Sequence, residues 1–596
     1  RGRDFLASAG LHWGILPKTA SRVYTRDAIS DKGKVLVSSQ QGRRADGARP
    51  CQEPRLVCTR GTRFLPVGGA APSTLELLSF VDILRELSRV GSPPPCSLSN
   101  CMITSSMNIN IQRTPSWEGK RMFVGREHEL AELERLYKRG GFQMVVLYGR
   151  RRVGKTALTL RFAQGKPTLS FTAKVQSDAM NLADFSLAIY GYFGLPRGVG
   201  SFRTWEDALR FVASEAGDQH LVVVFDEFPY AAQRNASLVS TLQIACDRYL
   251  SDTNVFLILT GSNQGFMEVE VLGLQGNKES LGEKNPLFGR RTAQIHLSPF
   301  GYREAALMLP GVSCEDLVRY YAAFGGTPYY LSMVDSEESF ATNVEELFFR
   351  KEGLLYEEPL MLLRQELREP AIYSSILDAI ASGANRPQLI ADRIGEERSS
   401  LTKYLRTLVT MRLVEKRVPF GESRERSRRG IYRISEPAFS FWYRFVQPEL
   451  DSIEMDAGEL VARDLLGSSD IPTYVGHWFE EICLQWVVAE ARAGALPLQP
   501  VHFGSWWGTD PSAHEQTDID VVAGNDRRSE LLVGECKWRN WFDVRQVARD
   551  LVHRAELLGA YDSTTYVIFS RKQLNNEFKK DVGEGWSFVD AERLYD

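Results

Sequence analysis

The chain has 596 residues, too many for one hydrophobic core, so we expect several domains. Its formal net charge of −3 excludes a generally basic nucleic-acid binder and leaves only local basic surfaces for such a partner. The apolar runs are too short to span a bilayer and the eight cysteines lack zinc-finger spacing, so we expect no membrane span and free thiols in a reducing cytoplasm.

The first 116 residues differ in composition from the rest of the chain. They are rich in Gly, Pro, Ser and Arg and contain little helical periodicity, which predicts a disordered segment. The first methionine is Met102, so the alternative is upstream sequence outside the natural protein, with a start at Met107 or Met122.

Apolar runs alternate with helical patterns over residues 117–300. An amphipathic helix follows "FVGRE", and apolar stretches at 142–148, 220–227 and 254–262 have the length of buried strands. This alternation is typical of a parallel sheet with helices on both faces. We therefore predict an α/β nucleotide-binding core.

The segment "GRRRVGKT" at 149–156 fits the phosphate-loop pattern between a strand and a helix. Glycines at Gly149 and Gly154 let backbone N–H groups surround phosphates. Lys155 is placed to neutralise the β and γ phosphates of ATP, and the Thr156 hydroxyl is placed to bind Mg²⁺. The alternative is a chance Gly-Lys turn.

Polar residues end the next two predicted strands. We expect Asp226 to help bind Mg²⁺ and Glu227 to act as the general base that polarises the attacking water. Solvated acids at a strand end are the alternative. Residues 260–263 close the following strand, and Ser262 lies where a γ-phosphate sensor is expected.

The motifs "FVGRE", "GRRRVGKT", "VVVFDEFPY", "LTGSN", "PLFGRRT" and "FGGTPYYL" together resemble the archaeal-type ATPases of the AAA+/STAND group of P-loop proteins. The resemblance implies ATP hydrolysis and a helical lid over residues 301–370. It places these residues at the nucleotide: Gly125, Arg126, Glu127 and Pro328. It also implies an arginine finger or sensor at Arg290 or Arg291, for which a surface ion pair is the alternative.

Residues 371–450 show three helical patterns followed by a predicted hairpin, the order of a winged helix-turn-helix. In the third helix, an apolar stripe leaves an outer face of Thr402, Lys403, Arg406 and Thr407. The loop of the hairpin contains four arginines that would reach DNA phosphates, namely Arg424, Arg426, Arg428 and Arg429. A rigid lid or protein-contact domain is the alternative.

Two predicted strands of the C-terminal part carry acidic residues. In "LLVGECKW" at 531–538, Glu535 and Lys537 share one face of an otherwise apolar strand, where charges require partners or a metal. In the preceding strand, Asp518 and Asp520 share one face. We expect Ile519 and Val521 on the other face.

These residues resemble the PD-(D/E)XK restriction-endonuclease-like fold, in a domain of unknown function that commonly follows ATPases of this type, here over residues 451–596. The resemblance implies Mg²⁺ bound by Asp520 and Glu535, with Glu480 from a preceding helix completing the outer shell. Lys537 would orient or deprotonate the attacking water. A structural Glu–Lys pair is the alternative, and a relic site would keep the same residues.

The sequence thus predicts an α/β ATPase core, a helical lid, a winged helix and an α/β nuclease-like domain. We expect a cytoplasmic ATP-hydrolysing enzyme that acts on DNA in processing or defence and forms homo-oligomers by analogy with its relatives. The alternative is a nucleotide-dependent switch that binds DNA or a protein and keeps the nuclease-like fold as a scaffold. A nucleotide-independent binding module would require an empty phosphate loop.

Overall fold

The computed structural model describes residues 123–196, 200–273, 286–574 and 585–596. The segment 1–116, predicted to be disordered or extraneous, lies outside these residues. In the described part, no helix is both long and apolar enough to cross a bilayer.

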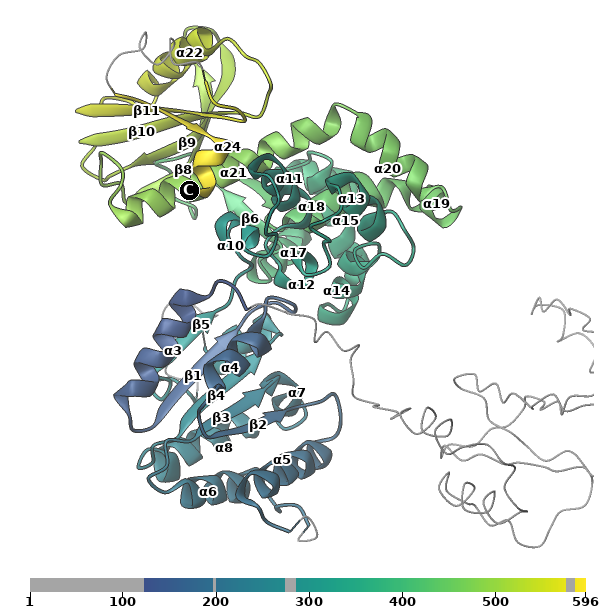
Figure 1. Ribbon diagram of the computed structural model, residues 1–596, viewed down its shortest axis with the longest axis vertical. Helices are drawn as coiled ribbons and strands as arrows, with labels where there is room; N and C mark the ends of the chain where they lie inside the picture. The colour runs from purple at the N-terminus through teal and green to yellow at the C-terminus, as the bar shows by residue number, and fades with distance from the viewer. Residues whose placement is uncertain (1–122, 197–199, 274–285, 575–584) are drawn as a thin grey trace, which may run out of the picture. The chain divides into compact units, whose positions relative to one another are not determined.

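The first sheet has five parallel strands in the order β2-β3-β4-β1-β5 (Figure 1). The strands are β1 (Gln143–Tyr148), β2 (Thr168–Thr172), β3 (Val222–Asp226), β4 (Phe256–Gly261) and β5 (Ala293–His296). The predicted parallel sheet is confirmed. Because β4 lies between β1 and β3, its end lies between the phosphate loop and the acidic residues that end β3.

Helices cover both faces of this sheet. As a result, β1, β3 and β4 are buried along their whole length. One face packs on α3 (Glu127–Arg139) and α4 (Lys155–Ala163). The other face packs on α5 (Asp178–Phe193), α6 (Trp205–Ala216) and α8 (Leu238–Ala245). Shorter helical segments complete the domain: α7 (Phe228–Ala232), η2 (Cys246–Leu250), α9 (Gln264–Phe266) and η3 (Met267–Val271).

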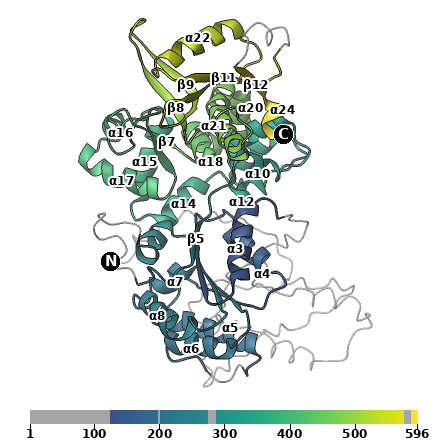
Figure 2. The same cartoon turned by 90° about the vertical axis from the view of Figure 1, so that its left-hand side faces the viewer.

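A helical region follows, and its apolar core continues into the C-terminal part of the chain. It begins with α10 (Tyr302–Ala306), α11 (Cys314–Phe324), α12 (Pro328–Leu331), α13 (Phe340–Phe348) and α14 (Glu358–Glu366). The three helices predicted next are α15 (Pro370–Ala381), α16 (Pro387–Ile394) and α17 (Arg398–Thr410), shown together in Figure 2. The predicted apolar stripe of α17 is buried at Leu401, Leu405 and Leu408.

The expected hairpin is also present. Strands β6 (Val414–Arg417) and β7 (Ile431–Ile434) pair antiparallel. Helices then lead to the C-terminal sheet: α18 (Pro437–Phe441), η4 (Trp442–Val446), η5 (Gln447–Glu449), α19 (Leu450–Glu454), α20 (Gly458–Gly467) and α21 (Asp470–Ala493).

The C-terminal sheet has the order β12-β11-β10-β9-β8. Its elements are β8 (His502–Asp510), β9 (Glu515–Gly524), β10 (Glu530–Lys537), α22 (Val544–Glu556), β11 (Ser563–Ser570), β12 (Trp586–Asp590) and α24 (Ala591–Tyr595). The pairs β8–β9 and β9–β10 are antiparallel, whereas β10–β11 and β11–β12 are parallel. The sheet packs on α21 through one face and on α22 through the other.

One expectation about β9 is wrong. Gly504 of β8 pairs with Val522, and Trp506 pairs with Ile519, so β9 has one residue more than β8 over this interval. Such a β-bulge interrupts the alternation of side chains. As a result, Ile519 packs in the core on the α22 side, while Val521 packs in the core on the α21 side. Asp520 lies between them, in the bulge.

A half-buried charge cluster joins the β6–β7 hairpin to α21. Glu481 of α21 forms ion pairs with Arg417 and Arg433, one from each strand of the hairpin. The Arg433 guanidinium also lies 4.5 Å from the centre of the Trp478 ring. Burial alone would raise the pKa of Glu481, but the two arginines lower it to about 2.

We predict that Glu481→Gln lowers the free energy of unfolding by about 1–3 kcal/mol, because it leaves Arg417 and Arg433 with Glu415 as their one remaining carboxylate partner. Since the pKa of Glu481 falls from 4.5 to about 2 on folding, its contribution is complete above pH 4.5 and is lost as the pH falls toward 2. Thermal unfolding followed by circular dichroism measures both effects. Glu459→Gln, in a well-exposed pair with Arg463, is the control; an equal loss in this variant would contradict the prediction.

Candidate functional site

The phosphate loop joins β1 to α4 and holds its lysine close to the backbone. Gly149 admits no side chain, because a Cβ there would lie 2.3 Å from the carbonyl oxygen of Leu297, and Gly154 has φ +93°. The Nζ atom of Lys155 donates to the carbonyls of Gly149 (3.0 Å) and Arg150 (2.9 Å). Burial lowers the pKa of Lys155, while Glu227 and Asp226 oppose this shift.

The residues predicted to bind magnesium lie together at the ends of β3 and β4. Thr156 donates through Oγ1 to Oδ2 of Asp226 over 3.2 Å. Oδ1 of Asp226 accepts from the Thr260 hydroxyl and from the backbone N–H of Glu227 (3.1 Å). A hydroxyl and a carboxylate suit Mg²⁺, which keeps most of its water and takes oxygen ligands from phosphates. This pair therefore fits the ion that the phosphate loop implies.

The proposed general base and sensor also meet. Oε2 of Glu227 accepts from the backbone N–H (3.1 Å) and the hydroxyl (2.8 Å) of Ser262. Glu227 has φ +51°, a left-handed conformation that is unfavourable for a residue with a side chain. Such outliers cluster at functional sites, where the surrounding contacts hold them. The geometry thus brings both side chains to the phosphate side of the sheet.

Arg126, which the family resemblance places near the adenine, is buried beside the loop. Its guanidinium donates to the carbonyls of Val153 (3.1 Å) and Ser298 (2.6 Å) and lies 4.4 Å from the centre of the Phe300 ring. Gly125 precedes it with φ +65°. The guanidinium therefore braces the phosphate loop, and contact of either residue with adenine stays a prediction.

Pro328 lies against the end of the phosphate loop. A Cβ at Gly154 would lie 4.0 Å from Cγ of Pro328, and the next residue, Tyr329, donates its N–H to the carbonyl of Arg152 over 3.4 Å. The helical region thus reaches the nucleotide side through α12. Closure of Pro328 over the base stays a prediction.

The two candidates for an arginine finger are bound elsewhere. Arg290 forms an ion pair with Asp247 over 2.6 Å, and Arg291 donates to the carbonyl of Leu272 over 3.0 Å. Among the described contacts, neither guanidinium meets the phosphate loop. Their role in hydrolysis stays a prediction.

Each of the three arginines in the phosphate loop forms an ion pair with a carboxylate of the helical region. The pairs are Arg150–Glu436, Arg151–Glu366 (3.2 Å) and Arg152–Glu358. The first is the most deeply buried, with side chains 7% and 2% exposed. These carboxylates were not predicted, because they follow the loop by 206 to 286 residues; the only sequence signal is three consecutive cations in a loop where one lysine meets the phosphates.

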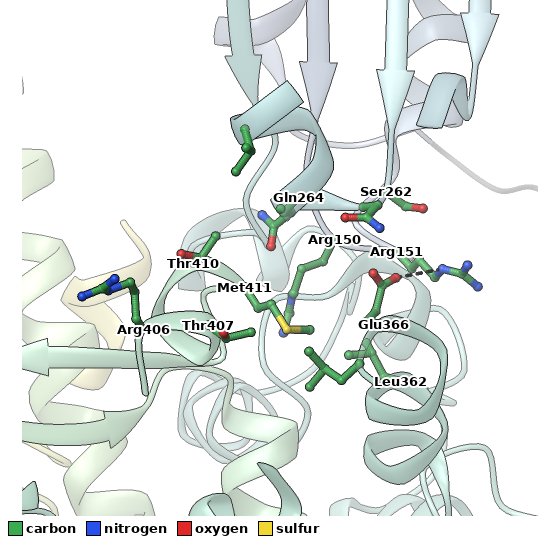
Figure 3. Close-up of a pocket in the computed structure, with 14 residues that line it drawn as sticks. Arg150, Arg151, Ser262, Gln264, Leu362, Glu366, Arg406, Thr407, Thr410 and Met411 are labelled. Atoms are coloured by element: carbon green, nitrogen blue, oxygen red, sulfur yellow. Dashed lines mark ion pairs between the residues drawn. The ribbon is translucent and has the colours of Figure 1, made fainter. Parts of the chain in front are cut away.

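A cavity of about 250 Å³ lies beside this loop (Figure 3). Its walls include Arg150, Arg151, Ser262, Glu366, Arg406 and Thr407. Arg406 and Thr407 belong to the outer face that the sequence predicted for α17. Figure 3 shows Glu366 directed toward Arg151, whereas Arg406 extends away from Arg150. The third predicted winged-helix segment therefore borders the nucleotide side of the ATPase core.

We predict that Glu366→Gln tightens ATP binding several-fold, because this carboxylate competes with phosphate for Arg151 and for the charge of Lys155. Burial and the nearby Glu227 raise the pKa of Glu366, which indicates that its negative charge is unfavourable there. A fluorescent ATP analogue measures the affinity. Lys155→Ala should abolish binding, and the control Glu346→Gln on the surface should leave it unchanged. Weaker binding by Glu366→Gln would contradict the prediction.

The second group of predicted residues lies on β9 and β10. Gly534 pairs with Val521, and the same register continued by one residue places Glu535 opposite Asp520. Oδ2 of Asp520 accepts from the backbone N–H of Cys536 over 2.7 Å. Burial, followed by the charges of Glu535 and Glu480, raises the pKa of Asp520 well above its usual value. Two carboxylates thus lie close together on adjacent strands.

Two cations flank Glu535. Lys537 lies 2.5 Å from Oε1, and Arg554 of α22 lies 3.0 Å from Oε2. Burial would lower the pKa of Lys537, but Glu535 raises it. The role of Arg554 was not predicted, because it comes from a helix 17 residues beyond the motif and no spacing marks it.

The donor set at this site suits magnesium only in part. Asp520 and Glu535 supply two carboxylates, the number that Mg²⁺ commonly uses together with water and substrate phosphate. Glu480 lies 3.5 Å from His477, and its charge only contributes to the raised pKa of Asp520. Within the described residues, no three acidic, histidine or cysteine side chains are grouped as metal ligands. Binding through Glu480 stays a prediction.

We predict that Asp520→Asn raises the melting temperature of the metal-free protein by about 2–4 °C, because it removes one of two buried like charges. The same variant should lose any stabilisation by Mg²⁺, since it removes a ligand. Differential scanning calorimetry with and without Mg²⁺ measures both. Glu515→Gln, at the exposed start of β9, is the control. A wild-type protein that Mg²⁺ does not stabilise would count against the metal site.

Comparison with known proteins identifies related families for the two regions of the chain that carry these residues. An ATPase domain found predominantly in archaea matches residues 123–334, and a family of archaeal and bacterial proteins of unknown function matches residues 442–550. The uncharacterized protein MJECL04 of Methanocaldococcus jannaschii is 30% identical over 465 residues, which cover 77% of this chain and 98% of that protein. The chain belongs to this archaeal ATPase family.

The resemblance to archaeal-type ATPases is therefore confirmed, and so is the match of the C-terminal part to a family of unknown function. The ATP-binding protein MJ0423 of the same organism is 49% identical to this archaeal ATPase over 45 residues, which cover 8% of this chain and 76% of that protein. The Walker-type ATPase PABY2304 of Pyrococcus abyssi is 21% identical, with a TM-score of 0.39 over 54% of this chain and 96% of that structure.

Proposed function

We propose that this archaeal-type ATPase hydrolyses ATP and uses its nucleotide state to control a magnesium-dependent, DNA-cleaving C-terminal domain. The observation that carries the proposal is the facing pair Asp520 and Glu535 beside Lys537, on adjacent strands of a mixed sheet. Buried carboxylates with an unfavourable shared charge and a neighbouring lysine suit a site that meets a divalent cation and a phosphodiester.

The topology of the C-terminal domain supports a PD-(D/E)XK assignment. Helix α21 precedes an antiparallel meander, β8 to β10, and α22 then connects β10 to its parallel neighbour β11. The bulge at Asp520 fits the same interpretation, because β-bulges commonly occur beside active sites, where they redirect a side chain.

The residues of the site can have separate roles in phosphodiester hydrolysis. Magnesium, when bound, would supply positive charge to the phosphoryl oxygens. The ammonium of Lys537 lies next to Glu535 and would orient the attacking water or take its proton. Arg554, on the other side of Glu535, would hold that carboxylate in place.

The three helices and hairpin over residues 370–434 support a winged helix, and the loop of the hairpin reaches the C-terminal sheet. Arg429 donates to the carbonyl of Trp507 over 3.1 Å, and Trp507 pairs with Asp518 across β8 and β9. All four arginines of that loop are exposed, namely Arg424, Arg426, Arg428 and Arg429. They lie where DNA phosphates bound by the wing would approach the sheet that carries Asp520.

The ion pairs of the phosphate loop supply the coupling. Phosphates that enter the loop would compete with Glu366 for Arg151 and with the backbone carbonyls for Lys155. Because Glu366 ends α14 and α17 borders the same cavity, this competition would shift the helices that lead to the C-terminal domain.

A nucleotide-dependent switch with a silent nuclease-like scaffold is the second candidate. The observation that favours it is the neutralisation of Glu535 by Lys537 and Arg554, since a structural ion pair needs no metal. In that case, only changes at the phosphate loop would alter the behaviour of the protein.

We predict that the purified protein cleaves DNA with Mg²⁺ and ATP and that Glu535→Gln or Lys537→Ala lowers the rate by at least about 100-fold, because each removes a group at the reacting phosphate. Lys155→Ala should abolish the dependence on ATP. Gel analysis of plasmid and single-stranded substrates measures cleavage. Glu530→Gln, at the other end of β10, is the matched control and should cleave normally. Intact DNA under all metal and nucleotide conditions would leave the switch as the function.

A further inference from the structure

Trp541 is the most exposed large apolar side chain of the described residues, with 81% of its surface accessible. It lies in the segment between β10 and α22, four residues after Lys537. A tryptophan side chain has a large apolar surface that is normally at least partly buried. At this exposure, the ring contributes little to packing within the chain and is available to a partner.

The segment that carries Trp541 is fixed at both ends. Trp538 is buried, with its ring centre 4.9 Å from that of Phe479. Asp543 caps α22 by accepting from the backbone N–H of Gln546 over 3.1 Å. Trp541 is therefore displayed from an anchored turn.

Trp541 lies close in the chain to the residues of the C-terminal site. Four extended residues span at most about 14 Å, so Trp541 remains near Lys537, the last residue of β10. Arg539 of the same segment is exposed and adds a positive charge. An aromatic face and a guanidinium beside carboxylates that suit Mg²⁺ and phosphate match the two parts of a nucleotide, the base and the backbone.

We propose that Trp541 stacks on an unpaired base, so that the C-terminal site takes DNA with a single-stranded segment. A base inside a duplex is covered on both faces by its neighbours, whereas an unpaired base can stack on an aromatic ring. The inference rests on the proposed function of this site as DNA-directed. It assigns the class of DNA, which the carboxylates alone do not determine.

Binding in Ca²⁺ instead of Mg²⁺ tests this without relying on cleavage. The probes are fluorescent oligonucleotides of equal length, one single-stranded and one a blunt duplex, followed by anisotropy with the full chain. Trp541→Ala should weaken single-strand binding by about 5- to 150-fold and change duplex binding much less, while Trp541→Phe should restore most of the affinity. Met455→Ala, 78% exposed in the helical region, is the matched control and should bind like the wild type.

Unchanged single-strand affinity in Trp541→Ala would overturn the inference, and so would an equal loss on both probes. Trp541-dependent binding to anionic lipid vesicles, with no binding to either DNA, would also overturn it and assign the ring to a membrane surface. The side chain is exposed, so its replacement should leave the melting temperature nearly unchanged. The two proposals can fail separately: a wild type that does not cleave DNA, yet binds single strands through Trp541, would refute the nuclease function alone.

Discussion

Charged groups removed from water must find counter-charges, and in this chain that requirement fastens the phosphate loop to the helices that follow it. The Arg150–Glu436 pair is almost completely desolvated, so breaking it would leave an unpaired charge at considerable cost. Arg151 and Arg152 extend the connection to both ends of α14. The loop that surrounds phosphate is thus also the contact through which the ATPase core holds its neighbours.

The same constraint explains the C-terminal sheet. Arg417 and Arg433 bring the β6–β7 hairpin onto α21 through Glu481, while Lys537 and Arg554 offset Glu535. Burial and the charges of Glu535 and Glu480 raise the pKa of Asp520, and Lys537 offsets only part of this shift. In this archaeal-type ATPase, acids paired with arginines thus connect elements that are distant in the sequence.

Local patterns were sufficient to predict the elements that surround both sites. The apolar runs of β1, β3 and β4 predicted a parallel sheet, because strands buried on both faces need no polar alternation. The phosphate-loop pattern predicted that Lys155 and Thr156 begin a helix, as they do in α4. The proximity of Asp520 to Glu535 followed from two adjacent strands joined by a short turn.

Long-range pairings were beyond such patterns. Glu358, Glu366 and Glu436 have no local signature, because an acidic residue on a helix is usually solvated and only the folded chain brings it to an arginine. The bulge in β9 was missed for a related reason: one additional residue in a strand changes its faces, yet the sequence keeps the same alternation on either side.

The contact of the hairpin loop with β8 also bears on aggregation between copies of the chain. β8 is the outermost strand of its sheet, and an uncovered outermost strand offers free N–H and C=O groups to any passing chain. Here Phe420 donates its N–H to the carbonyl of Ser505. The Arg429 guanidinium donates to the carbonyl of Trp507. The loop therefore covers part of this sheet edge and hinders the addition of a strand from another molecule. This protection against aggregation is independent of any ligand.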